Sequence, residues 1–150
     1  MKILNVQRLS LISALLLLFL ANCSFSYKKL PEIEVNPRQK ILAGEIALRL
    51  LSAWKMGDYQ ELGPEATIPM QRGLTPEKQQ QAYESIAARF GDFESLEYAE
   101  TWISKKASPL MIYRFRGDFE SGATLEIRVV MDSRDRLSGF WIKPWRRMRR

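Results

Sequence analysis

Histidine is absent from this chain of 150 residues, and cysteine occurs only once, at Cys23. Without histidine, the chain lacks the commonest metal ligand and the usual general base near neutral pH. A single cysteine excludes an internal disulfide, so a folded domain must be held together by its core alone. Calcium-loop spacings, glycine-rich phosphate loops and the Gly-x-Ser-x-Gly turn of hydrolases are also missing. The sequence therefore predicts no metal, no cofactor and no recognisable catalytic motif.

The formal net charge of +6 is concentrated at the C-terminal end. Five positive charges lie there, on Lys143, Arg146, Arg147, Arg149 and Arg150. Residues 38–142 carry 14 basic and 15 acidic side chains. A nucleic-acid-binding domain needs basic groups spread over its folded surface, so we expect no nucleic-acid partner. Trp145 and the basic tail, residues 146–150, are suited to contact with anionic phospholipid, with a disordered solubilising tail as the alternative.

A long apolar run lies at the N-terminus and ends near the cysteine. Lys2 and Arg8 precede about a dozen apolar residues, which is signal-peptide length and falls short of the roughly twenty needed to span a bilayer. Leu20-Ala21-Asn22-Cys23 resembles the lipobox of bacterial lipoproteins, although Asn22 departs from the usual Gly, Ala or Ser. In that family the thiol is linked to diacylglycerol and the cysteine becomes the new N-terminus. The resemblance implies a signal peptide helix over residues 1–22, an acyl anchor on Cys23 and a cell-envelope lipoprotein.

Other interpretations of this end remain open. Ser24-Phe25-Ser26 resembles an ordinary signal-peptidase site, which would release a soluble periplasmic or secreted protein beginning at Tyr27. The apolar run could also stay uncleaved as a short anchor, or Cys23 could be an incidental apolar residue. If Cys23 is lipidated, Ser24 after it favours the periplasmic face of the outer membrane. Residues 23–36 show little periodicity and predict a flexible tether.

Residues 37–145 predict one α+β domain. Apolar residues recur at helical spacing from Pro37 to Gly57, and a short helical turn is expected over residues 58–62. Thr75 begins a second helix that ends before Gly91. The apolar period then changes to two, which predicts strands at Phe93–Ser104, Leu110–Phe119, Ala123–Asp132 and Leu137–Pro144. Short connections make neighbouring strands antiparallel, with the helices packed on one face of a four-stranded sheet.

The pairing of these strands predicts two faces of different character. Alternate residues from Leu125 to Met131 share an apolar face with Phe140 and Ile142. On the opposite face we expect Arg114 to lie across from Glu126 and Arg128 across from Trp141. A solvated sheet face is the simpler interpretation of these arginines. The alternative is an anion-binding patch made by Arg114, Arg116 and Arg128.

Glu100 is the anomaly of the first predicted strand. If Leu96, Tyr98 and Trp102 face the core, Glu100 faces it as well, where desolvation would raise its pKa and suit it to acid–base catalysis. The alternatives are that a bulge or an edge position turns Glu100 to solvent, or that a tyrosine hydroxyl or the indole of Trp54 satisfies it. The residues of this hypothetical pocket are Glu100, Tyr59, Tyr98, Tyr113 and Trp102.

Three segments resemble the family called domain of unknown function 3887: Ala53–Tyr59, Phe90–Phe93 and Ser138–Pro144. The resemblance covers roughly Ile41–Trp145. It implies a nuclear-transport-factor-two-like, cystatin-like fold, in which a curved antiparallel sheet wraps helices to form a cone. The family has no agreed activity, so it supplies no catalytic residues. Cone-shaped relatives often hold a ligand between sheet and helices, and some are isomerases or dehydratases.

Two functions from different classes follow from these observations. The first is a non-catalytic, lipid-anchored binding or assembly domain of the cell envelope, whose partner is the membrane, an envelope protein or a small ligand. The second is a small-molecule-binding protein or an isomerase-like acid–base enzyme with its site inside the cone. The sequence leaves open whether the chain has any enzymatic activity.

Overall fold

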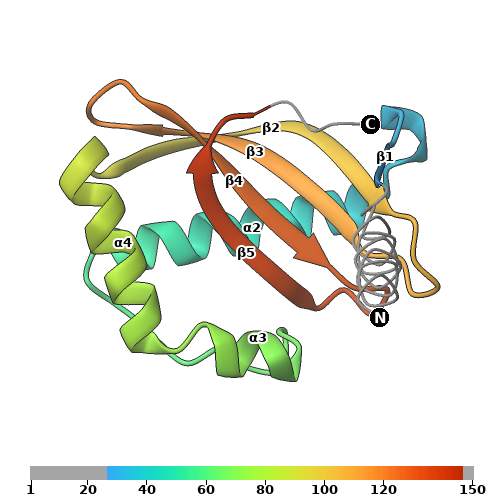
Figure 1. Cartoon of the computed structure of the whole chain (residues 1–150), viewed down its shortest axis with the longest axis horizontal. Coiled ribbons are helices and arrows are strands. Elements are labelled where there is room, and N and C mark those ends of the chain that lie inside the picture. The colour runs from blue at the N-terminus through green and yellow to red at the C-terminus, as the bar shows by residue number, and fades with distance from the viewer. Residues whose placement is uncertain (1–26, 147–150) are drawn as a thin grey trace, which may run out of the picture.

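The structure of the chain is a computed structural model that describes residues 27–146. The expected signal peptide, Cys23 and the last four residues of the basic tail lie outside the described residues. The described chain folds into helices packed on one antiparallel sheet, which confirms the predicted α+β class (Figure 1). The elements, in chain order, are β1 (Tyr27–Lys29), the 3-10 helix η2 (Glu32–Glu34), α2 (Pro37–Lys55), α3 (Ile68–Gly73), α4 (Pro76–Phe90), β2 (Phe93–Ser104), β3 (Met111–Phe119), β4 (Thr124–Met131) and β5 (Leu137–Pro144).

The sheet has five strands in the order β1-β2-β3-β4-β5, so the expected count of four is wrong. The additional strand, β1, comes from residues that were expected to form a flexible tether. Tyr27 pairs with Ser104 and Lys29 with Trp102, which places β1 along the free edge of β2. Three residues carry no readable period, so only the pairing with β2 defines this strand. Residues 27–36 of the expected tether therefore belong to the described fold, as β1, η2 and their connections.

Helix α2 begins and ends where local chemistry predicts. The side chain of Asn36 accepts hydrogen bonds from the backbone N–H groups of Arg38 and Gln39, at 3.0 and 3.3 Å, and Pro37 fills the first turn. Gly57 follows the helix with a φ of 74°, a conformation that glycine adopts without steric cost. The helix buries its apolar stripe against the sheet, including Ala43, Ile46, Ala47, Leu50, Leu51 and Trp54.

The connection between α2 and α4 differs from the prediction. Residues 58–62 form no helical turn; the Gln79 side chain holds this segment by donating a hydrogen bond to the Gln60 carbonyl at 2.7 Å. The helix α3 follows instead, at residues that show no clear apolar period. Helix α4 confirms the prediction, with Pro76 in its first turn and Gly91 after its last residue at a φ of 75°.

The register of the sheet agrees with the prediction in one hairpin and departs from it in two places. Strands β4 and β5 pair as expected, with Arg128 opposite Trp141, up to a shift between Val130 and Met131. Between β3 and β4 the register is displaced by two residues, so Arg114 lies opposite Arg128 rather than Glu126. A shift of two residues keeps every side chain on its expected face, because strand side chains alternate with a period of two.

The two faces of the sheet have different coverings. The described helices pack on the first, called here the helix-covered face; α2 runs behind the strands in Figure 1, and α4 and α3 lie to one side. Its apolar core includes Trp54, which meets Phe140 edge to face with ring centroids 5.5 Å apart. The second, the open face, has no described helix packed on it. Its side chains include Tyr27, Lys29, Glu100, Trp102, Ile112, Arg114, Arg116, Glu126, Arg128, Val130, Gly139, Trp141 and Lys143.

Candidate functional site

The open face is divided into a charged region and an apolar hollow by the register of its strands. Glu100, Arg114, Arg128 and Trp141 lie in one row across β2 to β5. The next row, on the Tyr27 side, begins with Lys29 of β1 and continues with the apolar Trp102, Ile112, Val130 and Gly139. A polar row therefore borders directly on an apolar row, which gives this face an amphipathic character.

Arg114 is the centre of the charged region. Its guanidinium donates to the carboxylates of Glu100 and Glu126, with an N–O distance of 2.6 Å to Glu126. Arg128 donates its Nε to the other oxygen of Glu126 at 2.7 Å, and Lys29 lies 2.7 Å from Glu100. Only 1% of the Arg114 side chain and none of the Glu126 side chain is exposed. This is a buried ion network, which contradicts the expectation of a solvated face for Arg114.

Cations outnumber carboxylates in this network. Lys29, Arg114, Arg128 and Lys143 pair with only two carboxylates, Glu100 and Glu126, which leaves a local charge of +2. The pKa of Lys143 is lowered, first by burial and then by the positive charges of Arg128, Arg114 and Arg146. This repulsion among cations indicates that the charged region has an excess of positive charge, which favours the binding of an anion.

Both carboxylates of the network are held in their ionised forms. Burial raises the pKa of Glu126, but the hydrogen bond from Arg114 and the charges of Arg128 and Arg114 outweigh it and leave the pKa below the ordinary 4.5. Burial also raises the pKa of Glu100, and Lys29, Trp102 and Arg114 bring it below the same value. Neither group carries a proton near neutral pH, so neither can act there as a general acid.

The C-terminal segment closes one side of the charged region. The ring of Trp145 lies 4.4 Å from the Arg114 guanidinium and 5.3 Å from that of Arg116. The carbonyl of Arg146 accepts a hydrogen bond from Arg114. Stacking of guanidinium groups on an aromatic face is favourable when water is excluded. The start of the basic tail is thereby fixed beside the charged region.

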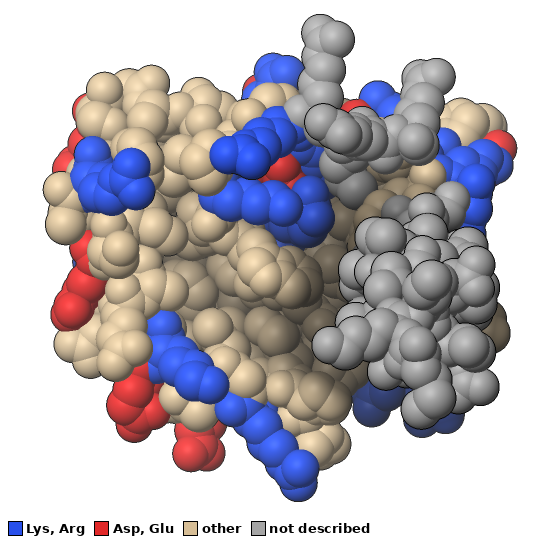
Figure 2. All heavy atoms as spheres, viewed as in Figure 1, with Lys and Arg blue, Asp and Glu red and all other residues tan. Residues whose placement is uncertain are grey.

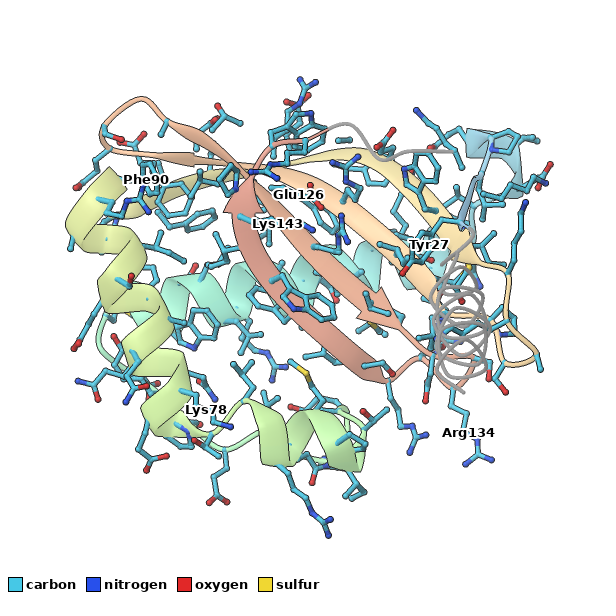
Figure 3. All side chains as sticks on the ribbon, in the orientation of Figure 1. Tyr27, Lys78, Phe90, Glu126, Arg134 and Lys143 are labelled. Carbon is cyan, nitrogen blue, oxygen red and sulfur yellow. The ribbon has the colours of Figure 1, made fainter. Side chains whose placement is uncertain are left out.

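Ile112 and Val130 of the apolar row form the floor of a hollow of about 270 Å³. Trp102, Ile112 and Val130 make a small buried cluster, against which Tyr27 and Leu110 pack. The full lining of the hollow comprises Tyr27, Ser104, Lys106, Leu110, Ile112, Arg128, Val130, Ser138, Trp141 and Lys143. Figure 2 shows Lys and Arg side chains gathered along a border of this hollowed face. In Figure 3, Glu126 and Lys143 lie close together at the charged end, and Tyr27 lies toward the other end.

Trp141 is the exposed aromatic residue of the hollow, with half of its surface accessible. Its ring lies over Gly139, so closely that a Cβ atom at Gly139 would overlap the outer ring atoms. Glycine at this position therefore sets the orientation of the Trp141 ring across the hollow.

Two buried N–H donors of the open face lack a hydrogen-bond partner among the described residues. They are Nε1 of Trp102 and Nε of Arg114. The Trp102 indole lies close enough to Glu100 to help lower its pKa, yet it does not reach hydrogen-bond geometry. Buried unsatisfied donors are costly, and their presence here sets this face apart from an ordinary packed layer.

The structure does not bring the five residues of the predicted pocket together. A bulge between Tyr98 and Glu100 reverses the alternation of β2, so Glu100 and Trp102 lie on the open face. Tyr98 and Tyr113 lie on the helix-covered face. The expectation that Glu100 points into the core is wrong; the alternative of a bulge is confirmed, but the bulge turns Glu100 into the ion network, with 15% of its side chain exposed, rather than to solvent. The expected rise in its pKa is also wrong.

The three tyrosines of that pocket have separate surroundings. The hydroxyl of Tyr113 donates to Gln39 at 2.8 Å, and burial raises the pKa of Tyr113 to about 12. The hydroxyl of Tyr98 lies 3.1 Å from Glu32 and 2.9 Å from Thr101. Burial, with the charges of Glu84 and Asp92, raises the pKa of Tyr59 at the α4 side. The phenols of Tyr98 and Tyr113 act as structural hydrogen-bonding groups in neutral form.

Sequence patterns indicated part of the open face and missed the rest. Arg114, Arg116, Arg128, Trp141 and Lys143 were expected on this face from strand alternation. Lys29 and Lys106 were not singled out, because they lie in a predicted tether and a predicted turn. Trp102 was assigned to the opposite face. The signal that could have found it is Glu100 itself, since an apparently inward carboxylate in an apolar strand suggests a bulge.

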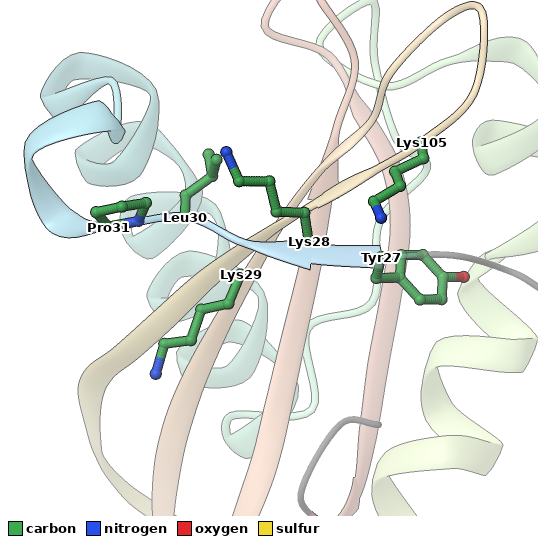
Figure 4. Close-up of a pocket in the computed structure, with 6 residues that line it drawn as sticks. All are labelled: Tyr27, Lys28, Lys29, Leu30, Pro31 and Lys105. Atoms are coloured by element: carbon green, nitrogen blue, oxygen red, sulfur yellow. The ribbon is translucent and has the colours of Figure 1, made fainter. Parts of the chain in front are cut away.

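Two further hollows are less suited to a ligand. One, of about 460 Å³, follows the outer edge of β1, where Lys28 and Lys29 point to opposite sides of the strand (Figure 4). Both lysines are paired, Lys28 with Glu34 at 3.6 Å and Lys29 with Glu100. The other, of about 260 Å³, lies between α2 and residues 58–65, beside Gln79 of α4, to which Trp54 donates at 2.8 Å. The first hollow has no buried residue in its lining, and the second, although the buried Leu50, Trp54 and Leu62 line it, has a single cation, Arg49, which pairs with Glu65.

Within residues 27–146, no group of three or more His, Cys, Asp or Glu side chains is arranged to hold a metal ion. In the same part of the chain, no helix is long and apolar enough to cross a membrane. Comparison of the chain with known protein families, with curated proteins and with solved structures finds no match.

Proposed function

We propose that this chain is a non-catalytic, lipid-anchored binding domain of the cell envelope, and that it binds its partner on the open face. The observation that carries the proposal is the open face itself. It combines a hollow with an apolar floor, an excess of cations over carboxylates and a half-exposed tryptophan. Ligand sites are concave and mostly apolar, with a few convergent polar groups, and this surface has that composition.

The chemistry of the charged region supports binding rather than catalysis. Glu100 and Glu126 are ion-paired with lowered pKa values, and the tyrosines of the helix-covered face have raised ones. An acid–base enzyme needs a group whose pKa lies near the working pH. The alternative of an isomerase-like site inside the cone has lost Glu100, the carboxylate on which it rested.

The anchor is proposed from the sequence, since residues 1–26 lie outside the described residues. The signal peptide and the lipid on Cys23 belong together, and Ser24 after the cysteine favours the periplasmic face of the outer membrane. The basic tail, including Arg146, Arg147, Arg149 and Arg150, is proposed to add contact with anionic phospholipid. An envelope protein or a small ligand is the alternative partner.

The family and the finer fold are proposed as well. The long helix α2 on one face of an antiparallel meander supports a nuclear-transport-factor-two-like cone and a relation to the domain of unknown function 3887. In such a cone a ligand would lie between sheet and helices. Here the apolar contacts of α2 fill that space, and the open face offers the larger uncovered area for a partner.

Fractionation of cells that express the wild-type chain or Cys23→Ala tests the anchor. We expect the wild type in the membrane fraction with the mass of an acylated N-terminus, and Cys23→Ala without acylation. Pull-downs from detergent-solubilised membranes then compare the wild type with Lys106→Glu/Lys143→Glu. An unmodified Cys23 in the mature protein, or partners unaffected by the open-face changes, would contradict the proposal.

A further inference from the structure

Strand β1 fixes how far the domain can move from a lipid on Cys23. Tyr27 is paired in the sheet, so only residues 24–26 separate Cys23 from the folded domain. Four residue steps span at most about 14 Å when fully extended. A tether over residues 23–36 would have allowed several times that distance. A lipidated Cys23 therefore holds the domain against the bilayer surface rather than above it.

The point of attachment lies beside the open face. Tyr27 lines the hollow together with Ser104 and Lys106, and its strand is the edge of the sheet next to β2. The chain enters the sheet at the Tyr27 end of the open face, where Lys106 also lines the hollow, and Lys143 lies toward the other end. Of the two faces that border β1, only the open one is free of described helices.

We propose that the open face docks on the membrane that holds the anchor, with the headgroup of an anionic phospholipid in the hollow. The proposal rests on the proposed lipid at Cys23 and names the partner of the same site. Lys106, Arg128 and Lys143 receive the phosphate, and the apolar floor around Ile112 and Val130 faces the glycerol and the first methylenes.

Charge complementarity selects an anionic lipid. The network beneath the hollow has two more cations than carboxylates, and neighbouring cations already repel Lys143. A phosphate near Lys143 and Arg128 would relieve that repulsion. The two chains of a diacylglyceryl group already give a stable attachment, and basic groups near an anionic surface add to it. The open face therefore fixes which side of the domain faces the membrane, independently of the tail.

The size and lining of the hollow fit a headgroup better than a whole lipid. Its volume of about 270 Å³ lies just below the range in which pockets enclose small molecules. A lipid whose chains stay in the bilayer needs to place only its polar end there. Trp141, half exposed at the hollow, is of the residue type that concentrates at membrane–water interfaces.

The helix side offers no comparable surface. Its exposed apolar side chains include Ile41, Leu48 and Met56, on or just after α2. Single exposed apolar residues are ordinary on soluble surfaces and do not mark an interface. Docking through α2 would also turn the cation-rich hollow away from the anionic lipid.

The test uses the full lipidated chain in vesicles of phosphatidylcholine, with or without phosphatidylglycerol that carries bromine on its acyl chains near the headgroup. Brominated lipid quenches a tryptophan that contacts it. We expect quenching by brominated phosphatidylglycerol in the wild type and its loss in Trp141→Phe. Trp54→Phe is the matched control, because Trp54 lies on the buried side of α2 and is only 2% exposed; its removal should leave the quenching intact.

A charge variant separates anion binding from simple proximity. Lys106→Glu/Lys143→Glu should reduce the phosphatidylglycerol-dependent quenching by about tenfold or more, since each basic group near an anionic surface contributes substantially. Arg38→Glu/Lys78→Glu makes the same change in net charge on exposed residues of α2 and α4 and should leave it unchanged. Equal quenching by brominated phosphatidylcholine, or equal effects of the two double variants, would overturn the proposal.

The outcomes also separate this inference from the proposed function. If the chain stays on vesicles through Cys23 but Trp141 is not quenched, the docking proposal fails and the anchored binding domain stands. If wild type and Cys23→Ala partition equally between vesicles and buffer, the proposed anchor itself fails, and the docking proposal fails with it. Trp141 quenching that requires both Cys23 and phosphatidylglycerol supports both.

Discussion

The two faces of the sheet are built from alternate residues of the same strands, yet they are stabilised in different ways. On the helix-covered face, Tyr113, Ile127 and Val129 are fully buried beneath α2 and hold the fold by apolar packing. On the open face, Arg114 and Glu126 are as deeply buried, but they are held by charge pairing. The comparison teaches that burial alone does not identify the core of this domain. One buried layer stabilises the fold, and the other keeps charged groups in fixed positions next to a hollow.

The largest expected effect comes from breaking the helix-covered face at Trp54. Trp54→Ala removes a buried indole, its edge-to-face contact with Phe140 and the donor to Gln79. We expect a loss of about 4 kcal/mol in the free energy of unfolding, because large-to-small changes in a packed core leave a cavity. Urea denaturation measures it. A loss below about 1 kcal/mol would show that α2 does not pack on the sheet as described.

The next largest effect tests the open face. Glu126→Gln keeps the shape of the side chain and removes the charge that pairs with Arg114 and Arg128. We expect a loss of about 3 kcal/mol, since removing one partner leaves buried charge uncompensated. Glu97→Gln, an exposed carboxylate of the same strand system, is the matched control and should change stability little. Equal, small effects of both substitutions would contradict a buried network.

Lowering the pH should distinguish the two faces of the sheet in the wild-type protein. The folded pKa of Glu126 lies below its ordinary value of 4.5, so this group contributes stability above about pH 4.5. That contribution is lost as the pH falls through the folded pKa. We expect the midpoint of urea unfolding to fall on acidification below pH 4.5, and to fall less in Glu126→Gln. If the wild type and Glu126→Gln lost stability equally on acidification, the acid sensitivity would not come from Glu126.

The sequence predicted those elements of the two faces whose periodic pattern of apolar residues is long. Helices α2 and α4 and strands β2 to β5 were predicted because a period of 3.6 or 2 persists over many residues. The shift of two residues between β3 and β4 exchanged the partners of Arg114 without exchanging faces. The bulge after Tyr98 places Glu100 and Trp102 on the face opposite to the predicted one, and no glycine in the sequence marks this bulge.

The remaining features depend on tertiary contacts that no local pattern records. Strand β1 is defined only by its partner in β2, and the hollow requires five strands to be placed together. Trp145 was noted as the start of a basic tail, but its stacking on Arg114 and Arg116 depends on where β5 ends. Strand alternation could place the arginines on one face, whereas the pairing of Arg114 with Glu100 depends on the bulge, and that of Glu100 with Lys29 depends on β1.

The smallest expected effect on stability reshapes the hollow alone. Gly139→Ala places a Cβ where the Trp141 ring lies, and this half-exposed ring can move outward. We expect stability to change by less than about 1 kcal/mol, because the ring end is mobile and the core is untouched. The fluorescence of Trp141, obtained by comparison with the spectrum of Trp141→Phe, should shift toward that of a solvated indole. An unchanged spectrum would mean that Gly139 does not position the ring.

The central claim, that one face stabilises the fold and the other meets the membrane, is tested most directly by a pair of tryptophan probes. The first is native Trp141 on the open face; the second is Leu48→Trp in a Trp141→Phe background, on the exposed side of α2, where Leu48 is 45% accessible. Quenching by brominated phosphatidylglycerol is measured for both lipidated proteins on the same vesicles. We predict strong quenching of Trp141 and none at position 48. Equal quenching at the two positions, or stronger quenching at position 48, would contradict the claim.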